Sequence, residues 1–135
     1  MMFDGINLLA VLAAGIASFA AGAAWYGVLG RLWMRAARLE PDRTRLSAGL
    51  AVGTLVCLLL MAFVFAGVIY HAGPVTVANG LLSASLIWVG FIATSLIVNH
   101  RFQRQSWSLT LIDGGHWFAV LLVQGAVIGA IGGAG

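Results

Sequence analysis

Charge is the scarcest property of this sequence. Charged residues make up 8% of the 135 positions, lysine is absent, and 61% of the residues are hydrophobic. With a mean hydropathy of +1.02, a chain of this length cannot enclose its apolar surface in a soluble core. The composition therefore excludes an ordinary soluble domain and predicts an integral membrane protein.

Cysteine and the usual patterns of catalytic residues are also rare or missing. Cys57 is the single cysteine, which excludes an internal disulfide. The sequence has no paired carboxylates, no glycine-rich phosphate loop and no nucleophile beside a base. We therefore expect no catalytic residues and no enzyme activity, and an intramembrane enzyme stays open as a third alternative to the two functions given below.

The few charges are unevenly placed along the chain. The pI near 10.0 comes from seven arginines, of which five lie between Arg31 and Arg45 and the others are Arg101 and Arg104. Arginines gathered in short polar intervals between apolar runs are typical of the cytoplasmic loops of membrane proteins. The basicity therefore indicates membrane topology, and we expect no nucleic-acid partner.

Long apolar runs make up most of the remaining sequence. Each run is long enough, at about 1.5 Å per residue, to cross a hydrocarbon layer of roughly 30 Å. The sequence predicts an all-α integral membrane protein, a four-transmembrane-helix bundle that forms a single domain over residues 1–135. The expected helices cover residues of about 5–30, 46–70, 77–100 and 108–131.

The arginine distribution also predicts the orientation. Residues 31–45 form the first loop, whose arginines at helical spacing alternate with apolar residues and suit a cytoplasmic amphipathic segment. The second loop, about residues 71–79, carries no Asp, Glu or Arg. The positive-inside rule then places both termini on the outer, periplasmic side of a bacterial inner membrane.

Two stripes of small residues recur at four-residue spacing. Ala14, Ser18 and Gly22 lie in the first run, and Gly125 and Gly129 lie in the fourth. Such stripes let helix backbones approach closely in lipid. We expect them to be packing surfaces within the protomer or between the protomers of a homo-oligomer.

Asp113 is the one acidic residue placed inside an apolar run. It lies about 9 Å along the fourth helix and His116 about 13 Å along, at a spacing that puts both on one face. An ionisable residue within a span indicates a functional site. The alternative is an interfacial Asp113 paired with Arg101 or Arg104.

Other polar and aromatic residues are expected at the same depth. Asn99 and His100 end the third helix, and Trp25 and Tyr26 lie near the end of the first. We therefore expect Asp113, His116, Asn99, Tyr26 and Trp25 to form a ligand-binding or proton-linked site. Because His100 and His116 differ in depth, we expect neither a metal nor a cofactor there.

Several short motifs follow one another in an order that is similar to a known family. They are Trp25-Tyr26, Trp33-Met34-Arg35, Gly90-Phe91-x-x-Thr94 with Asn99 after it, and Asp113-Gly-Gly-His116. Together they resemble the bacterial family of small four-helix membrane proteins catalogued as domain of unknown function seventeen sixty-one. The resemblance spans nearly the whole chain and implies a bundle of four spans, and it implies no activity.

Two functions follow from these observations. The first is a homo-oligomeric pore or carrier for a small solute or ion, with its polar site at the cytoplasmic end. The second is a non-transporting scaffold, a lipid-binding protein or an accessory subunit, in which the glycine stripes and the basic loop make the contacts. Membrane lipids are expected partners in both.

Overall fold

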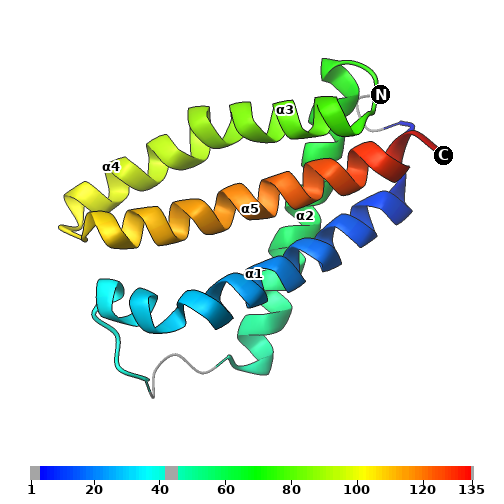
Figure 1. Cartoon of the computed structure of the whole chain (residues 1–135). Helices are drawn as coiled ribbons and strands as arrows, with labels where there is room; N and C mark the ends of the chain where they lie inside the picture. Colours follow the sequence, from blue (N-terminus) through cyan, green and yellow to red (C-terminus); the bar gives the residue numbers. More distant parts are fainter. Residues whose placement is uncertain (1–3, 42–45, 135) are drawn as a thin grey trace.

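Figure 1 shows the computed structural model of the chain, in which residues 4–41 and 46–134 are described. Every regular element within these residues is a helix. Four helical spans of the described chain are long and apolar enough to cross a membrane, which confirms the predicted all-α fold. The first, second and fourth spans are α1 (Leu8–Ala37), α2 (Ala48–Ala72) and α5 (Trp107–Ile131). The third span consists of α3 (Val77–Ile87), a π-helical segment (Trp88–Ala93) and α4 (Thr94–Phe102). A short 3₁₀ segment (Gly132–Ala134) follows α5.

Each span begins at a residue that suits a helix N-cap. The side chains of Asn7, Ser47, Thr76 and Ser106 accept hydrogen bonds from backbone N–H groups in the first turn that follows them. Such caps satisfy donors that would otherwise have no partner at the helix start. The polar residues between the apolar runs therefore set the helix boundaries.

The first helix is longer than the sequence indicated. α1 continues to Ala37 instead of ending near residue 30, so the first half of the expected loop 31–45 is helical. The helix ends at Arg38, which has a left-handed backbone (φ 57°) and donates its N–H to the Arg35 carbonyl. Residues 42–45 of that loop lie outside the described residues.

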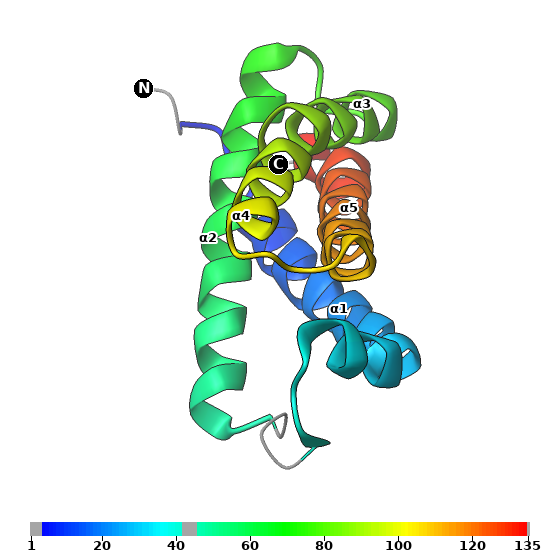
Figure 2. The same cartoon turned by 90° about the vertical axis from the view of Figure 1, so that its left-hand side faces the viewer.

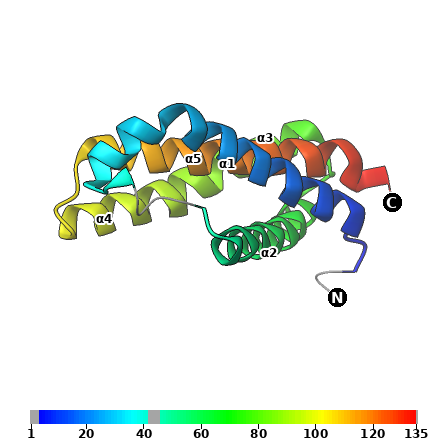
Figure 3. The same ribbon diagram turned by 90° about the horizontal axis from the view of Figure 1, so that it is seen from below.

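The spans form a layer of three with one helix across it. α5 lies between α1 and the third span, and these three run side by side (Figure 1). α2 passes behind the layer at a steep angle, as Figure 2 and Figure 3 show from the side and from below. Gly15 of α1 is buried, and a Cβ there would lie 3.1 Å from Cγ of Leu59, so its small size lets α2 approach α1 closely.

The two ends of the layer are held by contacts between different helices. At one end the Asn7 side-chain amide donates to the Ile131 carbonyl at 3.1 Å, so the start of α1 and the end of α5 are adjacent. At the other end the Ser106 hydroxyl lies 3.5 Å from the Ala36 carbonyl. The start of α1 and the end of α5 thus share one end of the molecule; which side of a membrane that end faces stays a prediction.

The glycines of α5 lie where the sequence stripes indicated close packing. A Cβ at Gly125 would lie 2.8 Å from the carbonyl carbon of Gly80 in α3. A Cβ at Gly129 would lie 2.6 Å from the Cα of Val77. Real Cβ atoms do not approach other atoms this closely, so glycine at these positions is what lets α3 and α5 touch along their backbones.

A buried amide joins α5 to both α1 and α2. The Gln124 side chain is fully buried, and its Nε2 donates to the Ser18 hydroxyl at 3.0 Å and to the Leu58 carbonyl at 3.1 Å. These bonds satisfy both N–H groups of the amide in an apolar surrounding, whereas Gln124 Oε1 is buried without a hydrogen-bond partner among the described residues. The apolar core surrounds this point: Val11, Ala14, Ala62, Phe65, Ala66, Ile69, Ala84, Leu121 and Ile128.

The first half of α2 packs against little else in the described chain. Leu50 and Val56 are 57% and 58% exposed, and no other group comes within 4 Å of a Cβ placed at Gly49 or Gly53. These two glycines therefore differ from those of α5 in having open space around them.

The contrast between the two sets of glycines generates a prediction. Gly125→Ala should lower the free energy of unfolding in detergent by about 1–3 kcal/mol. The atoms that a Cβ would meet belong to the Gly80 backbone, which cannot rotate away as a side chain can. The matched control Gly53→Ala should leave stability unchanged or raise it by up to about 1 kcal/mol, since alanine is the better helix former. Equal loss of stability in the two variants would mean that α3 and α5 do not touch at this point.

Candidate functional site

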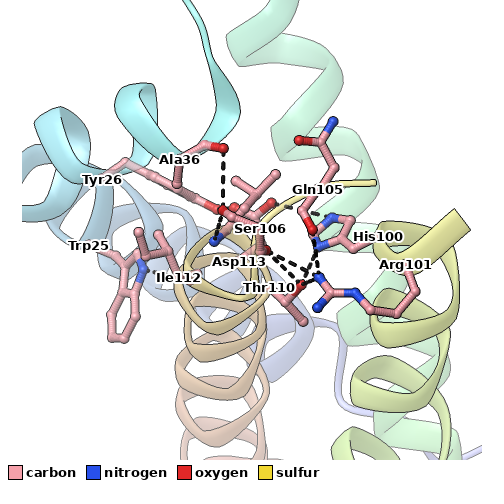
Figure 4. Close-up of polar contacts among 11 residues, drawn as sticks. Trp25, Tyr26, Ala36, His100, Arg101, Gln105, Ser106, Thr110, Ile112 and Asp113 are labelled. Atoms are coloured by element: carbon pink, nitrogen blue, oxygen red, sulfur yellow. Dashed lines mark hydrogen bonds and ion pairs between the residues drawn. The ribbon is translucent and has the colours of Figure 1, made fainter. Parts of the chain in front are cut away.

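Asp113 lies where three helices meet at one end of the layer (Figure 4). The Tyr26 hydroxyl of α1 donates to Asp113 Oδ1 at 2.7 Å. The His100 Nε2 atom of α4 lies 4.0 Å from Asp113 Oδ2, and the Asp113 side chain is 21% exposed. The carboxylate therefore faces other parts of the protein, with limited access from outside.

A second hydrogen bond orients His100. Its Nδ1 atom lies 2.8 Å from the Thr110 hydroxyl, which is also 3.3 Å from the Ser106 carbonyl. The tautomer of His100 decides which of the two groups donates in the bond to Thr110. In either tautomer the Nε2 atom of His100 faces the Asp113 carboxylate.

Arg101 closes the turn between α4 and α5. Its guanidinium lies 3.7 Å from the centre of the Trp107 ring and donates to the Thr110 hydroxyl at 2.8 Å. The same nitrogen donates to the carbonyls of Gln105 and Ser106, at 3.0 and 3.2 Å. Within the described residues Asp113 forms no ion pair with an arginine, so Arg101 supports the site through Thr110 instead of neutralising Asp113 directly.

Two tryptophans hold α5 on either side of Asp113. Trp25 Nε1 donates to the Ile112 carbonyl at 3.0 Å, and Trp88 Nε1 donates to the Gly114 carbonyl at 2.8 Å. A Cβ at Gly115 would lie 2.6 Å from the Trp25 ring, so the glycine makes room for the indole. The tryptophans on α1 and on the third span thus restrain the rotation of α5.

His116 packs one turn further along the same face of α5. The centre of its ring lies 4.8 Å from that of Tyr26, and its Nδ1 atom is buried without a hydrogen-bond partner in the described chain. A Cβ at Gly22 would lie 2.8 Å from His116 Nε2. Gly22 of the first stripe therefore makes room for an imidazole, while Ala14 and Ser18 of the same stripe are fully buried.

The structure brings together four of the five residues that the sequence indicated. Trp25, Tyr26, Asp113 and His116 lie together, whereas the Asn99 side chain is exposed and the neighbouring His100 turns toward Asp113. The sequence did not indicate that Thr110 would form a hydrogen bond with His100, or that Trp88 would donate one to the Gly114 carbonyl. Thr110 lies three residues before Asp113, a spacing that places both on one helix face and could have indicated its role.

The described residues contain no group of three or more His, Cys, Asp or Glu side chains placed to hold a metal ion. The cluster contains a carboxylate, two imidazoles and a phenol where three spans meet. Groups of these types exchange protons and accept or donate hydrogen bonds to small polar ligands.

The hydrogen bond between α1 and α5 generates the second prediction. Tyr26→Phe should lower the stability of the protein in detergent by about 1–2 kcal/mol, because it removes the donor to a carboxylate in a poorly hydrated place. The control Tyr70→Phe removes the hydroxyl of a side chain that is about half exposed and should change stability by less than about 0.5 kcal/mol. Similar melting temperatures for the two variants would contradict the assigned bond.

Comparison with known proteins identifies a family. A sequence model described as "Protein of unknown function (DUF1761)" matches residues 9–129, and the comparisons with curated proteins and with solved structures found no match. The matched residues include Trp25-Tyr26 and Asp113 to His116, the motifs on which the resemblance was based. The match covers nearly the whole chain, and the protein therefore belongs to the DUF1761 family.

Proposed function

We propose that this multi-pass membrane protein is a pore or carrier that moves protons, alone or together with a small solute, across a bacterial inner membrane. The observation that carries the proposal is the Asp113 carboxylate, held between α1, α4 and α5 by Tyr26 and beside His100. Placing a carboxylate within a span is unfavourable in free energy unless other groups bind it. Carboxylates held in this way are typical of proton relays in pumps and transporters.

The order of the polar groups supports movement of a proton inward from the end of the layer. Arg101 near the end of α4 and Thr110 near the start of α5 come first, His100 and Asp113 come next, and His116 lies deeper beside Tyr26. Carboxylates and imidazoles are the groups that proton relays within spans use, and here an imidazole lies on each side of the Asp113 carboxylate along the layer.

A path through the membrane requires more than one copy of the chain. Beyond His116 the seam between α1 and α5 is filled by Val120, Leu121 and the buried pair of Ser18 and Gln124. The third span instead carries exposed polar side chains, among them Ser95 and Asn99, which share a helix face. We propose that a homo-oligomer places such faces around the path, with the Asp113 end in the cytoplasm and the arginines on that side.

The alternative function is a non-transporting scaffold, a lipid-binding protein or an accessory subunit. In that case the hydrogen bonds of Asp113 would only hold the helices together. The two functions differ in whether the charge of Asp113 is needed when the fold is intact.

Internal pH measured in proteoliposomes tests the proposal. Vesicles with purified protein and an enclosed pH-sensitive dye would be given a potassium diffusion potential, without added solute and then with a panel of sugars, amino acids, carboxylates and inorganic cations. We expect the protein to change the internal pH faster than protein-free vesicles do. Asp113→Asn should abolish the change, and Glu40→Gln, at an exposed carboxylate, should retain it.

Two results would overturn this function. One is an internal pH that never differs from that of protein-free vesicles under any condition. The other is an equal response of the wild-type protein and Asp113→Asn, with both folded by circular dichroism, which would support the non-transporting alternative.

A further inference from the structure

A groove lies between the last turns of α1 and the first turn of α5. Its volume is about 540 Å³, and it is open to the outside of the molecule. It lies beside the Asp113 cluster but does not contain the Asp113 side chain. Its lining combines basic, hydroxyl and apolar side chains, which include Leu32, Arg35, Arg38, Ser106, Ser108 and Leu111.

The polar part of the groove is suited to a phosphate. Arg35 and Arg38 contribute two exposed guanidinium groups from α1, and among the described residues neither is paired with a carboxylate. Ser108 contributes an exposed hydroxyl from the other wall, where α5 begins, whereas the Ser106 hydroxyl there caps Leu109 and lies 3.5 Å from the Ala36 carbonyl. The dipole of the helix start adds to the attraction for an anion between these walls.

The apolar part of the groove indicates that the ligand is an amphiphile. Leu32 is 55% exposed and Leu111 is 73% exposed, and both line the groove beside the arginines. Ile112 continues this surface toward the middle of α5. A free inorganic anion would use the guanidinium groups alone, whereas a lipid would place acyl chains against the leucines.

We propose that this groove binds an anionic phospholipid, with its phosphate at Arg35 and Arg38 and an acyl chain along Leu32 and Leu111. Guanidinium groups bind phosphate oxygens by pairs of parallel hydrogen bonds. Arginines at the membrane surface are attracted to anionic lipids, and each contributes roughly a fivefold gain in affinity. The site does not depend on the proposed proton movement, because it uses none of the groups around Asp113.

Native mass spectrometry of the purified protein in a neutral detergent tests the proposal. The protein would be titrated with phosphatidylglycerol and with phosphatidylcholine of the same acyl chains, and water-soluble glycerol phosphate would be added as a competitor. We expect phosphatidylglycerol to bind more tightly than phosphatidylcholine. Glycerol phosphate should not displace it, because it lacks the chains that contact the leucines.

Variants on the two walls locate the site. Arg35→Gln combined with Arg38→Gln should weaken phosphatidylglycerol binding about 25-fold and leave phosphatidylcholine binding unchanged. Arg31→Gln, at an exposed arginine of the same helix outside the groove lining, is the matched control and should have little effect. Ser108→Asp should also weaken phosphatidylglycerol binding, by repulsion from the α5 wall, without any change in α1.

Four results would overturn the proposal, of which three concern the lipids and the variants. They are equal binding of the two lipids, an effect of Arg31→Gln as large as that of the double variant, and no effect of Ser108→Asp in a folded protein. Displacement of the lipid by glycerol phosphate would also overturn it, since the groove would then be a site for a free anion.

Discussion

The hydrogen bond from Tyr26 to Asp113 joins α1 to α5 at the carboxylate that lies within an apolar span. It also sets the rotation of α5, because Gln124 lies eleven residues further on, close to three helical turns, and therefore on the same face. On that face Gln124 bonds to Ser18 of α1. Two polar contacts three turns apart thus hold one face of α5 against α1.

The residues that directly follow Asp113 and Gln124 in the sequence face the third span. Gly114 accepts a hydrogen bond from Trp88, and Gly125, again eleven residues further on, touches Gly80. The rotation that directs Asp113 and Gln124 toward α1 therefore directs these glycines toward α3. In a membrane, where water cannot satisfy polar groups and apolar surface alone does not draw helices together, this combination of hydrogen bonds and close backbone contact is what gives the layer its order.

Much of this arrangement could be predicted from the sequence, because it depends on local periodicity. The four spans follow from run length, and the packing role of Gly125 and Gly129 follows from their spacing. The steep crossing of α2 could not be predicted, since nearly uniform apolar character around a helix indicates no preferred face. The sequence placed Asn99 and His100 together at this end of the third span but did not indicate that His100 alone faces Asp113, because adjacent residues point about 100° apart around a helix and packing decides which one faces inward.

Tyr26 and Asp113 act together to hold α1 against α5, and a double-mutant cycle measures this directly. The free energy of unfolding in detergent would be compared for the wild-type protein, Tyr26→Phe, Asp113→Ala and the double variant, because an asparagine oxygen could still accept the Tyr26 hydrogen bond. The assigned bond predicts a coupling energy of about 1 kcal/mol, so the double variant should lose less stability than the two single losses combined. Additive losses, within about 0.3–0.5 kcal/mol, would contradict the account.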